Sequence, residues 1–312
     1  MTTAHRPPVS PVLVLGAAVL GISIAGPLVR YSHAPPLTIA VWRLGLSLVV
    51  VAGFLAWTGT WRQYRRLARR DVAAAVGAGA FLAVHFWSWI ASVGMTSVAA
   101  SVVLVNMSPV IVAAGSALWL HERPTRRQLL GIAIALAGAM VLASGDARGG
   151  GSSGMLAGQA LLGDALAVLG AFTVSGYLLV GRRVRQKLDL WPYVGLVYGV
   201  AFGCVLLLAL AIGNPVLGQT PRELGLFALM ALGPMLLGHT GFNWALRYLP
   251  AYVVSLVALG EPVGATMLAA VLPGIAELPS ALTLAGGAII LGGVLLTTRR
   301  DERRAVPIPS DL

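Results

Sequence analysis

Apolar residues fill most of the chain, in long runs that short polar turns separate. A bilayer core requires about 20 apolar residues per helix. Ten runs meet this requirement: residues 11–30, 36–58, 72–92, 96–120, 127–144, 160–181, 190–212, 224–245, 250–272 and 280–298. The pattern therefore predicts an all-α integral membrane protein with ten transmembrane helices.

The apolar pattern occurs twice. Residues 96–138 contain an apolar run with an internal proline, a charged turn and a second apolar run with two glycines, and residues 251–293 repeat this order. The matched positions are Pro109 with Pro262, Glu122 with Glu277, Gly131 with Gly286, and Gly138 with Gly293. A nearly fixed offset of 153 to 155 residues in a chain of 312 indicates an internal duplication.

The duplication predicts a domain organisation with two five-helix repeats. The first covers residues 1–144 and the second 159–298, with a Gly/Ser-rich linker at 145–158 and a tail at 299–312. Glycine and serine make such a linker flexible. The glycines near the end of each repeat indicate close helix packing.

Composition supports the membrane class. Only 11% of residues are charged and mean hydropathy is +0.84, whereas soluble domains have about 25% charged residues. The single cysteine, Cys204, excludes an internal disulfide. The net charge of +11 could suggest nucleic acid, but the basic residues lie between apolar runs. They are better interpreted as topology signals, and we expect no nucleic-acid partner.

Loop charge predicts the orientation. If the N-terminus is cytoplasmic, 18 of the 22 Arg and Lys residues lie in cytoplasmic segments, three lie outside (Arg30, Arg148 and Arg222), and Arg43 lies within a span. This bias predicts that both termini are cytoplasmic and that the protein lies in the cytoplasmic membrane. Because each repeat has five spans, the two must insert in opposite directions. Inverted repeats are typical of secondary transporters, which bind substrate near the midplane between the repeats.

These features resemble a known family. The ten spans, the arginine in the second span, the Glu122-Arg123-Pro124-Thr125 turn and the Glu261-Pro262 pair are similar to the drug/metabolite transporter superfamily, in its EamA-type permease family. The resemblance covers nearly the whole chain. It implies a basket-like permease that mostly exports small metabolites or amino acids and is often proton-coupled.

The third span carries a polar stripe that could contact a substrate. His85, Ser88, Trp89 and Ser92 follow the spacing i, i+3, i+4, i+7, which puts them on one helix face. Aromatic rings with a few polar groups suit an organic ligand. The alternative is that His85 bonds a neighbouring helix and the tryptophans face lipid.

The eighth span carries a matching pair, His239 and Asn243. At an offset of 154 residues they match His85 and Trp89. The duplication therefore places a histidine at the same depth in each repeat, where we expect substrate binding or a structural role. Two histidines without carboxylates at ligand spacing argue against a metal site, and no cofactor is predicted.

Arg43 and Asp164 are candidate coupling or gating residues. A buried guanidinium needs an anionic partner or carbonyl groups. The candidates are Asp164, Glu261 and the carboxylate of a substrate, and a structural or gating role is favoured over substrate contact. Asp164 lies near the outer end of the sixth span.

Glu261 precedes Pro262 in the middle of the ninth span. The residue before a proline resists helical geometry and the proline frees a carbonyl, so a kink is expected here and, by symmetry, at Pro109. A buried carboxyl group at a kink is suited to carry a proton. Alternatively, Glu261 caps freed backbone or pairs with Arg43. Asn106 could satisfy freed backbone near Pro109.

The sequence favours a non-enzymatic secondary exporter of small metabolites or amino acids that works by alternating access. Its expected partners are a small-molecule substrate, the lipid bilayer and, if transport is coupled, protons, and a monomer suffices. An uncoupled facilitator of small neutral solutes stays open. A membrane enzyme that modifies lipids would need clustered catalytic groups, and a channel would need charged rings. The first span lacks an acid, so a neutral or zwitterionic substrate is favoured over a cation.

Overall fold

The computed structural model describes residues 7–96, 101, 104–147, 157–271 and 280–298. Within these residues the protein is helical and contains no strand. The first repeat contains α1 (Pro11–Ser23), α2 (Ala25–Tyr31), α3 (Pro36–Thr58), the short 3-10 helix η1 (Thr60–Arg66), α4 (Arg69–Met95), α6 (Ser108–Gly115), the π-helix η2 (Ser116–Leu120) and α7 (Arg126–Ala147). The second contains α8 (Ala157–Val184), α9 (Leu190–Ala211), α10 (Pro221–Met230), the π-helix η3 (Ala231–His239), α11 (Thr240–Ala245), α12 (Ala251–Ala258), α13 (Gly260–Val271) and α14 (Ala281–Thr298).

Eight segments among the described residues are long and apolar enough to cross a membrane. They correspond to every predicted span except the fourth and fifth. The fourth is represented by the shorter apolar helix Ser108–Leu120, because residues just before it lie outside the described part. The fifth coincides with α7, a helix of 22 residues. Large apolar side chains such as Leu20, Val49 and Leu207 are exposed on the outer surface, as expected for contact with lipid tails.

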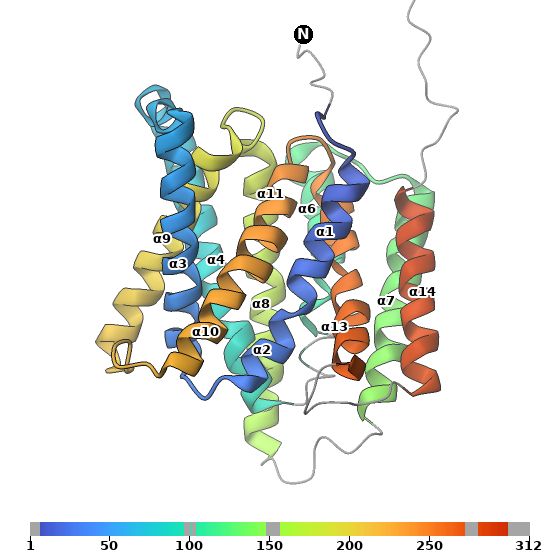
Figure 1. Cartoon of the computed structure of the whole chain (residues 1–312). Helices are drawn as coiled ribbons and strands as arrows, with labels where there is room; N and C mark the ends of the chain where they lie inside the picture. The colour runs from blue at the N-terminus through green and yellow to red at the C-terminus, as the bar shows by residue number, and fades with distance from the viewer. Residues whose placement is uncertain (1–6, 97–100, 102–103, 148–156, 272–279, 299–312) are drawn as a thin grey trace, which may run out of the picture.

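One face of the bundle is rich in arginine. The start of α1 and the end of α14 lie on the same side of the molecule as η1 and the loop that joins α8 to α9, at the top of Figure 1. We call this side the arginine-rich face, and its charged residues include Arg62, Arg65, Arg66, Arg182 and Arg247. The linker centre at 148–156, Glu277 and the tail at 299–312 lie outside the described residues.

The glycines predicted to mark close packing lie between α7 and α14, and this prediction is confirmed. A Cβ atom on Gly131 would lie 2.7 Å from the carbonyl oxygen of Gly293, and one on Gly138 would lie 2.8 Å from that of Gly286. The two helices run side by side at the right of Figure 1. The fifth and tenth predicted spans thus pair across the two repeats, backbone against backbone.

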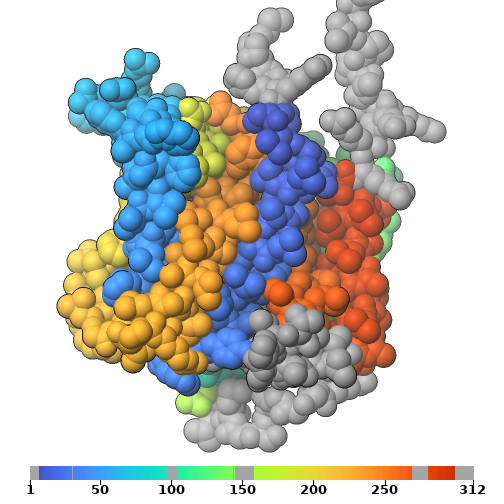
Figure 2. Space-filling model, in the orientation of Figure 1, coloured from blue at the N-terminus to red at the C-terminus, as the bar shows by residue number. Residues whose placement is uncertain are grey.

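A second glycine contact joins α1 to η3. A Cβ atom on Gly21 would lie 2.9 Å from the Gly233 carbonyl oxygen and from the Gly238 nitrogen. In the space-filling view, the blue surface of α1 lies directly against the orange surface of the α10–α11 segment (Figure 2). This contact brings the first helix of one repeat onto the second repeat.

Four of the predicted spans are broken or irregular rather than continuous. The first is interrupted at Ile24 between α1 and α2, the fourth turns at Asn106 before α6, and the ninth is interrupted at Leu259 between α12 and α13. The eighth is wound as a π-helix across Pro234. Each irregularity lies within about three to four residues of a proline, whose missing N–H weakens the helical ladder.

Candidate functional site

A buried cavity of about 90 Å³ lies between the two repeats. Its lining combines apolar, aromatic and charged side chains from at least seven helical segments. The lining residues are Ile22, Ala25, Arg43, His85, Phe86, Trp89, Val105, Asn106, Ser108, Val174, Tyr177, Leu178, Pro234, His239, Phe242, Val254, Ser255, Ala258 and Glu261. On this scale one water needs about 10–15 Å³, so the cavity has room for roughly six to nine waters or a small molecule of similar size.

All four irregular helices meet at this cavity. Ile22 and Ala25 flank the first break, Asn106 lies at the second, and His239 ends η3. Interrupted helices free backbone groups that a transported ligand can bind, and transporters of this general type place their sites at such interruptions. π-Turns within helices are also frequent at functional sites.

Arg43 is almost fully buried, at 1% exposure, and it lines the cavity from α3. Its guanidinium carbon lies 4.2 Å from the centre of the Phe86 ring, a cation–π contact. Its Nε atom has no hydrogen-bond partner among the described residues. The buried guanidinium therefore faces the cavity without an anionic side chain in contact.

Of the two side chains considered as partners for Arg43, only Glu261 lines the cavity. Asp164 lies off the cavity, where its carboxylate accepts a hydrogen bond of 2.7 Å from the Thr96 hydroxyl. Glu261 lines the cavity with Arg43 and is close enough to interact with it electrostatically. The described residues nevertheless show no ion pair between Arg43 and Glu261.

The two matched histidines meet in the cavity. The ring centres of His85 and His239 are 6.5 Å apart, and the His239 ring lies edge-on to Phe86 at 5.1 Å. His85 Nδ1 lies 3.0 Å from the Gly170 carbonyl oxygen. Since a carbonyl only accepts hydrogen bonds, Nδ1 must donate the proton, which leaves Nε2 as an acceptor in the neutral ring.

The polar stripe of α4 divides between the cavity and the neighbouring helices. His85 and Trp89 line the cavity, whereas Ser88 and Ser92 do not. The Ser88 hydroxyl donates to the His85 carbonyl, and the Ser92 hydroxyl lies 2.6 Å from that of Ser101. The stripe is wider than the part of the helix that faces the cavity, because α8 packs against one side of it.

Asn243 also lies off the cavity. Its side-chain oxygen accepts a hydrogen bond of 2.7 Å from the hydroxyl of Tyr177, which lines the cavity. Asn243 therefore positions a lining residue rather than contacting the space itself. Its backbone carbonyl accepts a further bond from Arg185.

The two proline positions flank the cavity in equivalent ways. Pro109 lies in the first turn of α6, directly after the turn at Asn106, and Pro262 follows Gly260 at the start of α13. By the same alignment, Ser108 occupies the position of Glu261. Sequence analysis missed Ser108, Tyr177 and Ser255 as lining residues, although the alignment with Glu261 was a signal for Ser108.

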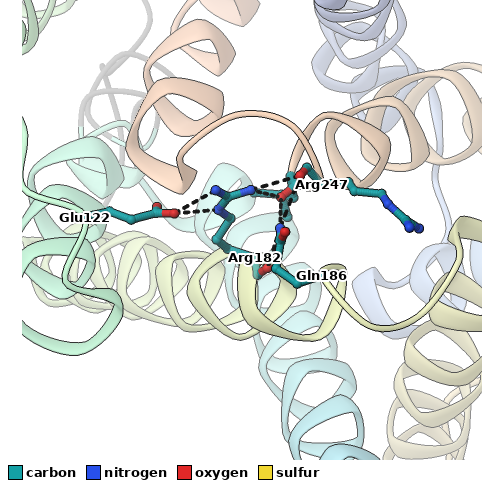
Figure 3. Close-up of polar contacts among 5 residues, drawn as sticks. Glu122, Arg182, Gln186 and Arg247 are labelled. Atoms are coloured by element: carbon teal, nitrogen blue, oxygen red, sulfur yellow. Dashed lines mark hydrogen bonds and ion pairs between the residues drawn. The ribbon is translucent and has the colours of Figure 1, made fainter. Parts of the chain in front are cut away.

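A polar network links the repeats at the arginine-rich face (Figure 3). Arg182 of α8 forms an ion pair of 2.7 Å with Glu122 of the first repeat. Arg182 also donates to the backbone carbonyls of Leu246 and Arg247, at 2.8 and 3.1 Å, and the Gln186 amide donates to the same two carbonyls. Glu122 thus pairs with an arginine of the other repeat.

A second set of contacts reinforces this face. Asp189 accepts hydrogen bonds from Gln63 and Arg247, at 2.6 and 2.7 Å. Burial alone would raise the pKa of the Asp189 carboxyl, but these two bonds outweigh it and hold the pKa below its usual range. Burial lowers the pKa of the neighbouring Arg185 to about 10, which leaves that guanidinium charged at neutral pH.

The described residues contain no group of three or more His, Cys, Asp or Glu side chains that could hold a metal ion. The polar and aromatic groups that line the cavity are one guanidinium, one carboxyl, two imidazoles, the Asn106 amide, hydroxyls and aromatic rings. These groups can bind, orient and release a small polar molecule.

Comparison with known proteins places the chain in a family. A model of the EamA-like transporter family matches residues 10–144 and, again, residues 161–299. The chain belongs to the EamA-like transporter family. The resemblance inferred from the sequence is thus confirmed, and the double match agrees with a two-repeat, multi-pass membrane protein of a transporter family.

Solved structures share this fold. Among 29 matching chains, one titled "Crystal structure of protein" superposes with a TM-score of 0.77, over 93% of this chain and 96% of its own length. It is 19% identical in sequence, so it supports the fold alone. No curated protein matches the chain.

Proposed function

We propose that this EamA-family protein is a secondary transporter that exports a small metabolite, such as an amino acid, across the cytoplasmic membrane by alternating access. One observation carries the proposal. A cavity lies between the two repeats, at the meeting point of four irregular helices, and its lining includes Arg43, Glu261, His85 and His239. Ionisable side chains are costly within a membrane and usually mark the path of a substrate or an ion.

The lining residues have distinct proposed roles. His85, Trp89 and His239 contact the substrate, while Arg43 and Glu261 hold its charged groups or couple its movement to that of protons. Ser88, Ser92 and Asn243 support the cavity lining, since each forms a hydrogen bond with a lining residue (His85, Trp89 and Tyr177, respectively) rather than facing the cavity itself. Asp164 fixes the end of α4 through Thr96.

The network at the arginine-rich face is the proposed cytoplasmic gate. The positive-inside rule places this face in the cytoplasm. Because Glu122 and Arg182 join the two repeats there, their contacts must break before the cavity can open to that side. This conformation is therefore closed toward the cytoplasm, and rocking of the repeats opens it.

Proton coupling is proposed to run through Glu261, since its carboxyl lines the cavity without a hydrogen-bond donor among the described residues. An uncoupled facilitator would use the same cavity and the same gate. We propose a monomer as the functional unit, because the duplication supplies both repeats within one chain.

Uptake into oriented vesicles tests the proposal. Everted and right-side-out vesicles containing the protein would be offered labelled amino acids and other small metabolites, with and without an imposed pH gradient. We expect saturable flux of a small compound that rises with the gradient. Saturable flux that ignores the gradient would identify a facilitator, and no flux of any compound through folded protein would contradict a transport function.

A further inference from the structure

We propose that an apolar groove on the outer surface, between η1, the start of α4 and α9, binds an anionic phospholipid of the surrounding bilayer. The acyl chains of the lipid lie in the groove, and its phosphate binds Arg66 and Arg69. The groove shares no lining residue with the central cavity, so this site does not depend on the proposed transport function.

The groove is open and almost entirely apolar. It has a volume of about 500 Å³, and every residue that lines it is partly exposed. Tyr64 contributes the only polar side-chain atom of the lining, and its hydroxyl donates a hydrogen bond of 3.0 Å to the Pro192 carbonyl. No lining side chain therefore offers a free polar group, and the groove suits hydrocarbon. The other lining residues are Leu67, Val72, Gly195, Leu196, Gly199 and Val200.

Two glycines of α9 account for the shape of the groove. A Cβ atom on Gly195 would lie 2.8 Å from the Tyr64 hydroxyl, so η1 packs directly against the backbone of α9 at this point. One turn further along α9, a Cβ atom on Gly199 would meet nothing within 4 Å. The groove is therefore bounded by η1 on the side of the arginine-rich face, and it is open at Gly199.

Exposed arginines lie beside this end of the groove, on η1 and at the start of α4, in the segment that follows α3 at the top of Figure 1. They are Arg62, Arg65, Arg66, Arg69 and Arg70. None of them forms an ion pair with a described residue. The nearby carboxylate of Asp71 is already paired with Lys187, at 2.7 Å. The cluster therefore carries positive charge that no described carboxylate neutralises by direct contact.

Arg66 and Arg69 are the two arginines placed to bind a phosphate at the groove. Arg66 directly precedes the lining residue Leu67. Arg69 lies three residues before the lining residue Val72 in α4. On a helix this spacing puts Arg69 and Val72 on the same face, with Arg69 about one turn nearer the arginine-rich face. Arginine binds phosphate oxygens through two parallel N–H donors.

Tryptophans indicate that this arrangement lies at the membrane surface. Trp57, near the end of α3, is 82% exposed. The guanidinium carbons of Arg62 and Arg65 lie 5.4 and 5.3 Å from the centre of the Trp61 ring in η1. Tryptophan is enriched where the hydrocarbon core meets the lipid headgroups. The arginines thus lie at the level of the headgroups, and the groove lies at the level of the adjoining acyl chains.

Charge alone does not require a groove. The positive-inside rule accounts for arginines in a cytoplasmic loop, but not for an apolar groove that begins beside them. Clusters of basic residues directly cytoplasmic to a transmembrane helix attract anionic lipids. An anionic phospholipid matches both features, because one molecule carries a phosphate charge and hydrocarbon chains.

The groove also joins the two repeats. Tyr64, Leu67 and Val72 belong to the first repeat, and α9 belongs to the second. A lipid in the groove contacts both repeats and favours the arrangement in which they form it. Because a ligand that binds only the folded state raises its unfolding temperature, binding should be measurable as thermal stabilisation.

Thermal unfolding of the purified protein in a neutral detergent tests the site. The unfolding midpoint would be followed against the concentration of phosphatidylglycerol, of phosphatidylcholine with the same acyl chains, and of glycerol 3-phosphate. We expect phosphatidylglycerol to bind roughly tenfold more tightly than phosphatidylcholine, because the basic residues attract its net negative charge. Glycerol 3-phosphate, which lacks acyl chains, should leave the midpoint unchanged.

Two arginine variants test the contact with the headgroup. Arg69→Gln should reduce the preference for phosphatidylglycerol severalfold. Arg65→Gln is the matched control, because it removes the same charge from a side chain that lies over the Trp61 ring, and it should leave the preference nearly unchanged. Both side chains are exposed, so both variants should fold.

Two glycine variants test the groove without changing the charge. Gly199→Leu should weaken the binding of phosphatidylglycerol roughly tenfold, because the leucine side chain would occupy the groove in place of the acyl chains. Gly53→Leu is the control. A Cβ atom on Gly53 of α3 also meets nothing within 4 Å, but Gly53 does not line the groove.

Equal stabilisation by the two lipids, or stabilisation by glycerol 3-phosphate, would overturn the anionic-phospholipid site. An equal loss of preference in Arg69→Gln and Arg65→Gln would also overturn it, since the arginines would then act only as diffuse charge. An unchanged affinity in folded Gly199→Leu would show that the acyl chains lie elsewhere. Each of these results would leave the transport proposal standing.

Discussion

His85 and His239 occupy matched positions in the two repeats, and their imidazole rings lie 6.5 Å apart. The sequence offset of 154 residues thus becomes a contact across the centre of the molecule. Because the repeats meet in opposite directions, two residues at the same depth in each repeat can share one space. The pair identifies the cavity as a product of the duplication and not of either repeat alone.

We predict that His85→Ala lowers transport at least tenfold while the protein still folds. The substitution removes a lining group and one donor to the Gly170 carbonyl, which still accepts from the Thr173 hydroxyl, so the lost bond costs about 0.5–1.5 kcal/mol of stability. Initial rates of vesicle uptake, with thermal unfolding as the check on folding, measure both effects. Ser92→Ala is the control on the same helix face but off the cavity. A normal uptake rate in His85→Ala would move the site elsewhere.

Glu261→Gln should make flux insensitive to a pH gradient if Glu261 carries the coupling proton. Glutamine keeps the size of the side chain, but its amide cannot bind and release a proton near neutral pH. The measurement compares uptake with and without an imposed gradient in the variant, in Asp164→Asn and in the unaltered protein. If Glu261→Gln responds to the gradient as strongly as Asp164→Asn does, Glu261 has a purely structural or binding role.

Glu122→Gln should open the arginine-rich face more often. It removes the charge that pairs with Arg182 across the repeats. In a Cys204→Ser background, Ser108→Cys would place the only thiol in the cavity, and its labelling by a membrane-impermeant reagent from that face reports opening. We expect labelling to become severalfold faster.

The control for this experiment is Arg65→Gln. Arg65 also lies on the arginine-rich face, and its guanidinium carbon lies 5.3 Å from the centre of the Trp61 ring within the same short helix η1, apart from the network in Figure 3. Labelling of Ser108→Cys should keep its original rate in Arg65→Gln. Equal labelling rates with and without Glu122→Gln would argue against the proposed gate.

Gly286→Ala should destabilise the protein strongly, whereas Gly292→Ala should not. A Cβ atom on Gly286 would lie 2.3 Å from the backbone nitrogen of Leu142, and one on Gly292 would meet nothing within 4 Å. Overpacking costs about 1–3 kcal/mol, and rigid backbone offers little relief. Thermal unfolding of both variants measures the difference, and similar midpoints would show that α7 and α14 can separate without cost.

Asp189 predicts a pH dependence at the arginine-rich face. Because its folded-state pKa lies below the usual value of about 3.9, the ionised carboxylate stabilises the folded state above that value. This contribution is lost as the pH falls through the folded-state pKa. Asp189→Asn should therefore unfold at a lower temperature near pH 7, and the gap to the unaltered protein should close below about pH 4. A constant gap would show that the carboxylate charge is not responsible.

Much of the fold could be predicted from sequence, because membrane spans and repeats produce patterns that are visible in the sequence itself. Apolar runs define the spans, and the matched prolines and glycines reveal the repeats. Close packing at the matched glycines also follows from sequence, whereas the contact of Gly138 with Gly286 of the other repeat is seen only in the structure. The π-helix around Pro234 does not follow, because the choice between a kink and a wider turn depends on how α1 packs against it.

The site was only partly predictable, because its lining also depends on how distant helices pack together. Helical spacing shows that His85, Ser88 and Ser92 share a face, but α8 decides which part of that face reaches the cavity. Glu122 has three arginines close in sequence, yet it pairs with Arg182, 60 positions away. Such choices depend on how distant helices are arranged, and no local pattern records them.

The described lining of the cavity draws on both repeats but takes nothing from α7 or α14. Those two helices pack against each other through glycines at the side of the bundle, while other helices line the cavity. Helix packing and the proposed substrate selectivity therefore depend on separate parts of the chain. A substitution that changes the substrate need not weaken the packing of α7 against α14. One fold can therefore acquire new specificities and remain stable.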